Sequence, residues 1–166
     1  MFVDSHCHIN FPDFANDLDG VLDRMAESKV EKALCVSVNL GTFPDVLKIA
    51  TQYKNVYASV GIHPNEKRTT FETSVDDLCL LSDHKEVVAI GETGLDYFRA
   101  EKEGLEWQQE RFRAHIKCAR EVKKPLIIHT REAKADTIKI MREERAGQIG
   151  GVMHCFTETF EMAQEA

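Results

Sequence analysis

The sequence predicts an α/β fold in which short parallel strands alternate with longer helices. Short runs rich in β-branched and aliphatic residues recur along the chain, as is typical of buried parallel strands. Between these runs, apolar residues repeat at the spacing of amphipathic helices. One strand with its helix takes up about 30 residues, which is the length of a βαβ unit.

Six strands are expected in chain order. Their ranges are residues 2–4, 33–38, 56–62, 87–91, 126–129 and 151–153. Because parallel neighbours need a crossover connection, the segments between them are expected to be helical.

Apolar periodicity predicts a helix in each of these connections. The apolar positions, helix by helix, are Leu18, Val21, Leu22 and Met25; Phe43, Val46, Leu47 and Ala50; Val75, Leu78 and Leu81; Leu105, Phe112, Ile116 and Ala119; and Ile138 and Met141. Residues 157–166 resemble the first turns of a sixth helix and carry no stop signal. We therefore expect the chain to end inside an element.

The composition is that of a globular domain. The 166 residues are 43% hydrophobic and 30% charged, which excludes a disordered chain and allows one domain over residues 1–166. No apolar run approaches the ~20 residues of a membrane helix, and the first residues lack the features of a signal peptide. The five cysteines show no CxxC spacing. We expect a cytoplasmic protein with reduced thiols and no membrane partner.

The net charge of −7 gives no global basic field. This argues against a partner held by many phosphate contacts. It leaves open a site that meets phosphate through bound cations, because such ions dominate the local charge.

Histidines and carboxylates gather where the expected strands end. These residues are His6 and His8 after the first strand, His63 after the third, Glu92 and Asp96 after the fourth, His129 at the end of the fifth, and His154 after the sixth. In a (β/α)8 barrel the active site lies at this end of the strands. The shared end therefore favours a TIM-barrel type over an open doubly wound sheet, although six units cannot close a barrel of ~250 residues.

The pattern of donors predicts a metal site. His6 and His8 point the same way from a strand and can chelate one ion. Glu92 can bridge two cations, and His129 with His154 could complete a second site. Nitrogen and oxygen donors without thiolate suit Zn, Mn and similar ions. Taken singly, a histidine at a strand end is more often a hydrogen-bonded polar residue or a helix cap, but that interpretation does not predict one shared face.

Three further residues each have more than one interpretation. His63 could contact substrate or orient a ligand, or it could be an ordinary polar residue. Asp96 could act as a base, orient a ligand or cap a helix. Arg131 could meet a substrate anion or form a surface salt bridge with Glu132 or a neighbour.

The remaining candidates are expected to be structural. His84 and His115 are expected to be exposed helix or turn residues. Strand alternation points Cys7 and Cys155 into the core rather than toward the site.

Five segments together resemble the TatD family of metal-dependent deoxyribonucleases, within the amidohydrolase-like TIM-barrel superfamily. They are Asp4-Ser5-His6-Cys7-His8, Gly61-Ile62-His63-Pro64, residues 90–97, residues 125–131 and His154-Cys155-Phe156. Their order and spacing are specific, and the resemblance runs along the whole chain.

The resemblance implies a single metal-dependent hydrolase domain with a (β/α)8 fold and two divalent ions, which could be Mg, Mn or Zn. It implies His6, His8 and Glu92 at the first ion, and Glu92, His129 and His154 at the second. It implies a DNA substrate, single-stranded or at 3′ ends, and a 3′–5′ exonuclease. The family's remaining ligand is an aspartate after strand eight, which this sequence does not include. Without the last two strands, the exposed sheet edges are expected to allow self-association.

Two other functions remain open at this stage. One is hydrolysis of cyclic amides, lactones or esters, as in other amidohydrolase-like barrels. Many of those enzymes place a modified lysine on strand four, where this sequence has Glu92. The other is a non-catalytic or inactive protein that lacks part of the barrel.

Overall fold

The computed structural model describes residues 1–67, 72–98 and 105–166. Strands and helices alternate along the chain, as predicted. The strands are β1 (Phe2–Cys7), β2 (Val30–Cys35), β3 (Val56–Val60), β4 (Val87–Asp96), β5 (Leu126–Arg131) and β6 (Gly151–Met153). The helices are α1 (Leu18–Glu27), α2 (Phe43–Gln52), α3 (Val75–Ser82), α4 (Glu106–Val122), α5 (Lys134–Glu143) and α6 (Phe160–Glu165), with short 3-10 turns at Pro12–Phe14 and Ala146–Gln148.

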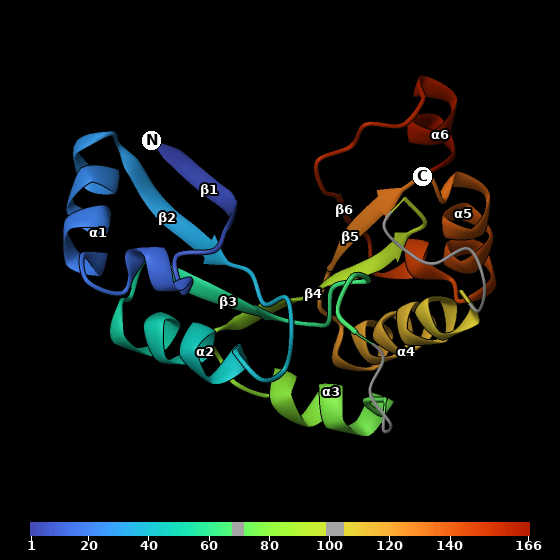
Figure 1. The fold of residues 1–166 in the computed structure, drawn as a ribbon, viewed down its shortest axis with the longest axis horizontal. Helices are drawn as coiled ribbons and strands as arrows, with labels where there is room; N and C mark the ends of the chain where they lie inside the picture. The colour runs from blue at the N-terminus through green and yellow to red at the C-terminus, as the bar shows by residue number, and fades with distance from the viewer. Residues whose placement is uncertain (68–71, 99–104) are drawn as a thin grey trace.

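The six strands form one parallel sheet in the order β1-β2-β3-β4-β5-β6. The sheet curls as part of a barrel wall, with α1 to α5 on its outer side (Figure 1). This confirms the TIM-barrel type with six βα units. Among the described residues, no helix combines the length and the apolarity needed to cross a membrane.

The main core lies between the strands and the inner faces of the helices. Phe112, Ile116 and Ala119 of α4 are fully buried, as their spacing predicts. They belong to one cluster with Ile90 and Leu95 of β4. This packing fixes β4, which carries the carboxylates of the candidate site.

Strand boundaries differ from the predictions most at β4. The predicted strand ended at residue 91, whereas β4 continues to Asp96. The added residues include Gly94, and glycine is a poor strand former. The structure accommodates the glycines through irregular pairing with β5 between Ile90 and Thr93.

Two predictions about exposure were wrong. His115 was expected to be exposed, but its side chain is fully buried. It lies beside Ile116 on the inner face of α4, where both ring nitrogens have hydrogen-bond partners. Cys155 was expected in the core but is exposed, because the chain leaves β6 at Met153 and Cys155 adopts a left-handed conformation with φ of 44°. His84 is exposed as predicted.

Candidate metal centre

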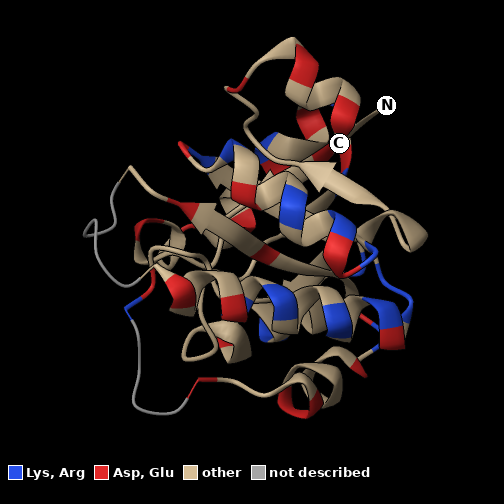
Figure 2. Cartoon of the chain, turned by 90° about the vertical axis from the view of Figure 1, so that its right-hand side faces the viewer, with Lys and Arg blue, Asp and Glu red and all other residues tan. Residues whose placement is uncertain are grey.

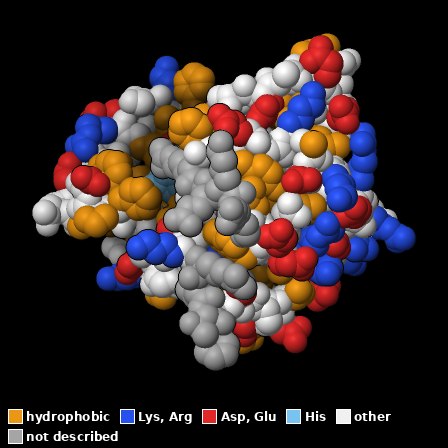
Figure 3. Space-filling model, turned by 45° about the vertical axis from the view of Figure 1, so that its right-hand side comes forward, with side chains coloured by type: hydrophobic (Ala, Val, Ile, Leu, Met, Phe, Trp, Pro, Cys, Tyr) orange, Lys and Arg blue, Asp and Glu red, His pale blue; other side chains and the backbone are white. Residues whose placement is uncertain are grey.

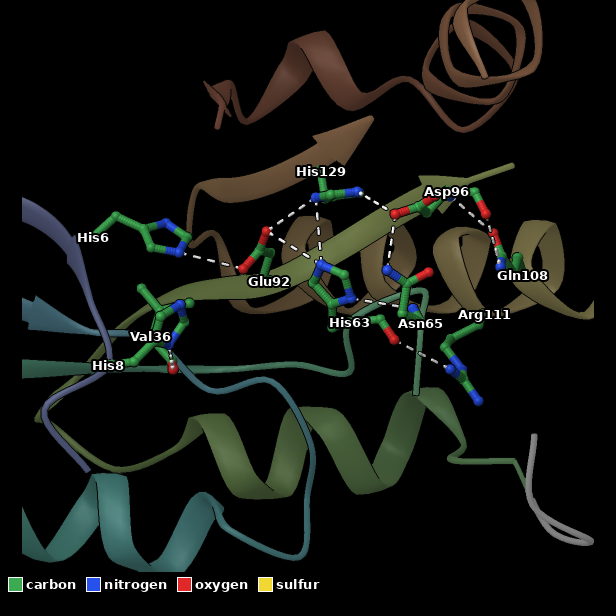
Figure 4. A network of polar contacts seen from close by, with 10 residues as sticks. All are labelled: His6, His8, Val36, His63, Asn65, Glu92, Asp96, Gln108, Arg111 and His129. Atoms are coloured by element: carbon green, nitrogen blue, oxygen red, sulfur yellow. Dashed lines mark hydrogen bonds and ion pairs between the residues drawn. The ribbon is translucent and has the colours of Figure 1, made fainter. Parts of the chain in front are cut away.

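The candidate site is built around Glu92, whose side chain is buried inside the curl of the sheet. Only 3% of Glu92 is exposed. Its backbone amide donates to the carbonyl of Ser37 at 3.0 Å. The carboxylate faces imidazoles that come from β1, β5 and the end of β3 (Figure 4).

Two glycines beside Glu92 allow β4 and β5 to approach closely. Gly94 has a φ of 131°, and a Cβ there would lie 2.0 Å from the carbonyl oxygen of His129. Gly91 has a φ of 145°, and its Cβ would lie 2.6 Å from the carbonyl oxygen of Ile127. Both positions therefore require glycine, because the φ angle is positive and because there is no space for a Cβ atom.

The first donor group consists of His6, His8 and Glu92, whose ligand atoms lie within 4.8 Å of one another. Nε2 of His6 is 3.3 Å from Oε2 of Glu92. His8 Nδ1 lies 3.0 Å from the carbonyl oxygen of Val36, which fixes the proton on that nitrogen and leaves Nε2 with its lone pair. The predicted first set of ligands is thus close together in space.

The second donor group consists of His63, Glu92 and His129, also within 4.8 Å. Oε1 of Glu92 lies 3.3 Å from Nδ1 of His129 and 3.6 Å from Nε2 of His63. Both groups share Glu92, one carboxylate oxygen facing each group (Figure 4). This is the arrangement that a bridging carboxylate needs.

His154 does not lie in either donor group among the residues described. Its ring stacks on that of His6, with centroids 3.4 Å apart and planes at 9°. The structure therefore places His154 beside the first group and His63 in the second. The assignment of His154 as a ligand stays a prediction.

Asp96 contacts the ring nitrogen of His129 that faces away from Glu92. Its Oδ2 lies 3.1 Å from Nε2 of His129 and accepts from the amide of Asn65 at 2.8 Å. The backbone of Asp96 is held in turn by the Gln108 side chain, at 3.0 Å and 3.3 Å. A carboxylate in this position fixes the proton on Nε2 and directs the Nδ1 lone pair toward Glu92. Asp96 is thus placed to orient His129, and its assignment as a base or as a helix cap stays a prediction.

Burial and contacts shift the pKa values of the ionisable groups. Burial raises the pKa of Glu92, but its contacts with His129 and His6 outweigh this effect, and the pKa lies well below its usual range. Burial lowers the pKa of His63 to about 4, so the ring is neutral at neutral pH. Burial also lowers that of His129, but the carboxylates of Glu92 and Asp96 outweigh it and raise the pKa.

Four supporting residues were not found from the sequence. They are Asn65, Gln108, Arg111 and His115. Arg111 is buried, pairs with both Glu72 oxygens at 2.8 Å and donates to the carbonyls of Glu66 and His63. Gln108, Arg111 and His115 lie on the inner face of α4, where the apolar pattern predicts only packing. The only sequence signal that could have identified these supporting residues was the presence of polar residues on the apolar face of this helix.

The donors fit a divalent cation. Among the described residues, the buried Nδ1 of His6 has no hydrogen-bond partner, and its buried Nε2 faces only the Glu92 carboxylate. Within the described ranges, no lysine or arginine forms an ion pair with the buried Glu92 carboxylate. Such groups are costly unless a cation compensates them. Imidazole and carboxylate donors suit Zn and Mn.

The mouth of the site is not strongly basic. Figure 3 shows a histidine surface recessed in a hollow that hydrophobic side chains border. Lysines and arginines lie mixed with acidic residues along the outer helices (Figure 2). Arg131 forms no ion pair with Glu132 in the described part of the chain, and its guanidinium instead lies 3.8 Å from the centre of the Phe98 ring. Within the described residues, the surface salt bridge considered for Arg131 is not formed.

Comparison with known proteins agrees with this geometry. Residues 3–166 match the family described as TatD related DNase. The chain is 42% identical to the uncharacterized metal-dependent hydrolase YcfH of Escherichia coli, over 98% of this chain and 62% of that protein. It is 30% identical to the 3′-5′ ssDNA/RNA exonuclease TatD of Salmonella typhimurium, over 91% of this chain and 58% of that protein.

Among solved structures, the TatD homologue YjjV of Escherichia coli superposes with a TM-score of 0.89 at 30% identity, covering 99% of this chain and 63% of that one. The chain thus spans less than two thirds of the length of these relatives.

Proposed function

Because the chain belongs to the family of TatD-related DNases, we propose that it carries the site of a metal-dependent phosphodiester hydrolase. The proposed substrate is single-stranded DNA, degraded from its 3′ end. The observation that carries the proposal is the buried Glu92 carboxylate, with one oxygen facing each of two donor groups. The Salmonella relative, described as a 3′-5′ ssDNA/RNA exonuclease, supports the choice of substrate.

The residues have distinct roles in this proposal. His6 and His8 would hold one ion and His129 the other, with Glu92 shared between them and His154 as a further ligand. Two Mg, Mn or Zn ions bound there would neutralise phosphate charge and lower the pKa of a water molecule. Asp96 would keep His129 in the tautomer that offers Nδ1.

His63 is placed to donate a hydrogen bond to substrate. Its Nδ1 accepts from the backbone amide of Asn65 at 3.1 Å. The neutral ring therefore carries its proton on Nε2, the atom that points toward Glu92 and His129. Because burial lowers its pKa to about 4, the ring is neutral at neutral pH and can donate a hydrogen bond, but no proton, from Nε2. A neutral donor at this point suits a phosphate oxygen.

The test is degradation of a 3′-labelled single-stranded DNA by the wild-type chain and by Glu92→Gln. The amide keeps the shape of the side chain but loses the charge shared by both groups. We expect chelator-sensitive loss of label from the wild type. In Glu92→Gln both the rate and the affinity for metal should fall by more than about a hundredfold, since even supporting residues cost 10–100-fold.

A matched control is Glu31→Gln, an exposed carboxylate on β2, which should change neither quantity. Parallel assays with a lactone and a cyclic amide examine the alternative substrate class. Cleavage of those compounds without loss of DNA label would overturn the nuclease proposal. Unchanged metal content in Glu92→Gln would remove Glu92 from its bridging role.

A further inference from the structure

An exposed aromatic ring lies beside the candidate site and has no role in the chemistry proposed so far. Phe98 follows β4 directly, and 53% of its surface is exposed. Its backbone amide donates to Oδ1 of Asp96 at 3.1 Å. Phe98 is therefore attached to the same carboxylate that orients His129.

Arg131 covers one face of this ring. Its guanidinium carbon lies 3.8 Å from the ring centroid, within the distance of a cation–π contact. The pairing of β4 with β5 fixes both partners, because Arg131 is opposite Asp96 and its carbonyl accepts from the Tyr97 amide at 2.9 Å. In the ranges described, no carboxylate lies within ion-pair distance of this guanidinium.

The segment below the ring is held rigidly. The Tyr97 hydroxyl donates to Asp136 at 2.8 Å and accepts from Gln109 at 2.9 Å. Gln109 also donates to Asp136 at 3.0 Å. These contacts fix the residue before Phe98, so little conformational freedom is left to lose when a ligand packs on the ring.

We propose that Phe98 and Arg131 form a platform on which a nucleobase of single-stranded nucleic acid stacks beside the metal centre. This inference rests on the proposed function and names how that site holds its substrate. Every nucleobase has a flat π-face, so stacking on an aromatic ring holds a single strand without reading its sequence. Arg131 supplies positive charge at the ring, and its guanidinium N–H groups can donate to an adjacent phosphate. The occupant fits a protein of net charge −7, which must hold a polyanion by a few local contacts.

Direct binding tests the platform independently of catalysis. A short labelled oligothymidylate is compared with an abasic oligonucleotide of the same length and charge, by fluorescence anisotropy in the presence of Ca²⁺. We expect the wild type to bind the base-containing strand about fivefold or more tightly than the abasic strand. Phe98→Leu, which keeps an apolar side chain, should abolish this preference, whereas Phe98→Tyr should retain it.

Phe2→Leu is the matched control. Phe2 is 64% exposed at the start of β1, at the end of the strands opposite to the site. This variant should keep the wild-type preference. Arg131→Gln should weaken binding of both strands and reduce the salt dependence by about one ion, as expected for one lost phosphate contact.

The outcomes separate this proposal from the proposed function. Equal binding of the two strands by the wild type, or an unchanged preference in Phe98→Leu, overturns the platform. If either of these results is obtained but the wild type still removes label from the 3′ end, the proposed hydrolase function stands without the platform. Failure both to bind and to cleave either strand overturns both.

Discussion

His115 should make the stability of the metal-free protein depend on pH. The ring is fully buried beneath the site, where Nδ1 donates to the carbonyl of Arg111 at 2.8 Å and Nε2 accepts from the amide of Ile62 at 3.1 Å. Burial lowers its pKa from 6.5 to about 4, although the bond to Arg111 opposes part of this shift. Protonation would turn Nε2 from an acceptor into a donor that faces another donor.

The lowered pKa of His115 determines the sign and the size of the change in unfolding free energy with pH. The folded-state pKa of His115 lies below its unfolded value, so the unfolded chain binds more protons between pH 6.5 and about 4. The stability that the neutral ring contributes is complete above pH 6.5 and is lost as the pH falls toward 4. At pH 5, His115 alone should lower the free energy of unfolding by about 2 kcal/mol relative to neutral pH.

Urea denaturation in the presence of a chelator measures this effect. Wild type and His115→Gln are unfolded at pH 7.5 and at pH 5, and the difference in unfolding free energy is compared. His63 also has a pKa lowered to about 4, but it is present in both proteins and cancels. The difference in unfolding free energy between wild type and His115→Gln should be smaller at pH 5 than at pH 7.5 by about 2 kcal/mol. His84→Gln, an exposed control, should show no such change, and a constant difference for His115→Gln would refute the argument.

Two further substitutions probe the surroundings of Glu92. Gly94→Ala places a Cβ 2.0 Å from the His129 carbonyl oxygen at a φ of 131°, so it should destabilise the fold by more than about 3 kcal/mol; a melting temperature within a few degrees of wild type would contradict this close packing. Asp96→Asn removes the charge that orients His129 and should weaken metal binding about 10–100-fold. Competition with a coloured chelator measures that affinity, and an unchanged value would exclude the orienting role.

The repeating pattern of the chain predicts the fold because buried positions recur at the period of the helix or strand that carries them. The apolar positions of α4 that the spacing selects, Phe112, Ile116 and Ala119, are all buried. Hydrophobic spacing does not show where a strand ends within a glycine-containing run. It is the approach of β5 that lets β4 continue through Gly91 and Gly94 to Asp96.

The candidate site was predictable where donor residues lie toward the carboxyl ends of parallel strands. His6, His8, Glu92 and His129 meet because parallel strands present their carboxyl ends on one side. The supporting contacts were not predictable in the same way. Asn65 reaches Asp96 across 31 positions and His115 reaches Ile62 across 53, and such partners depend on three-dimensional packing that no local pattern encodes.

The position of β1 at the edge of the sheet links metal occupancy to local unfolding. In the described structure, β1 pairs with β2 alone, yet His6 on this strand and His8 directly after it are two of the histidine donors. An ion held by His6, His8 and Glu92 would link β1 to β4, and β1 could not separate from the sheet without releasing it. At a free ion concentration one hundred times Kd, mass action adds about 2.7 kcal/mol to the closed state. Opening of this edge and loss of the ion are then one thermodynamic event, which makes the outermost strand the part of the molecule most sensitive to metal supply.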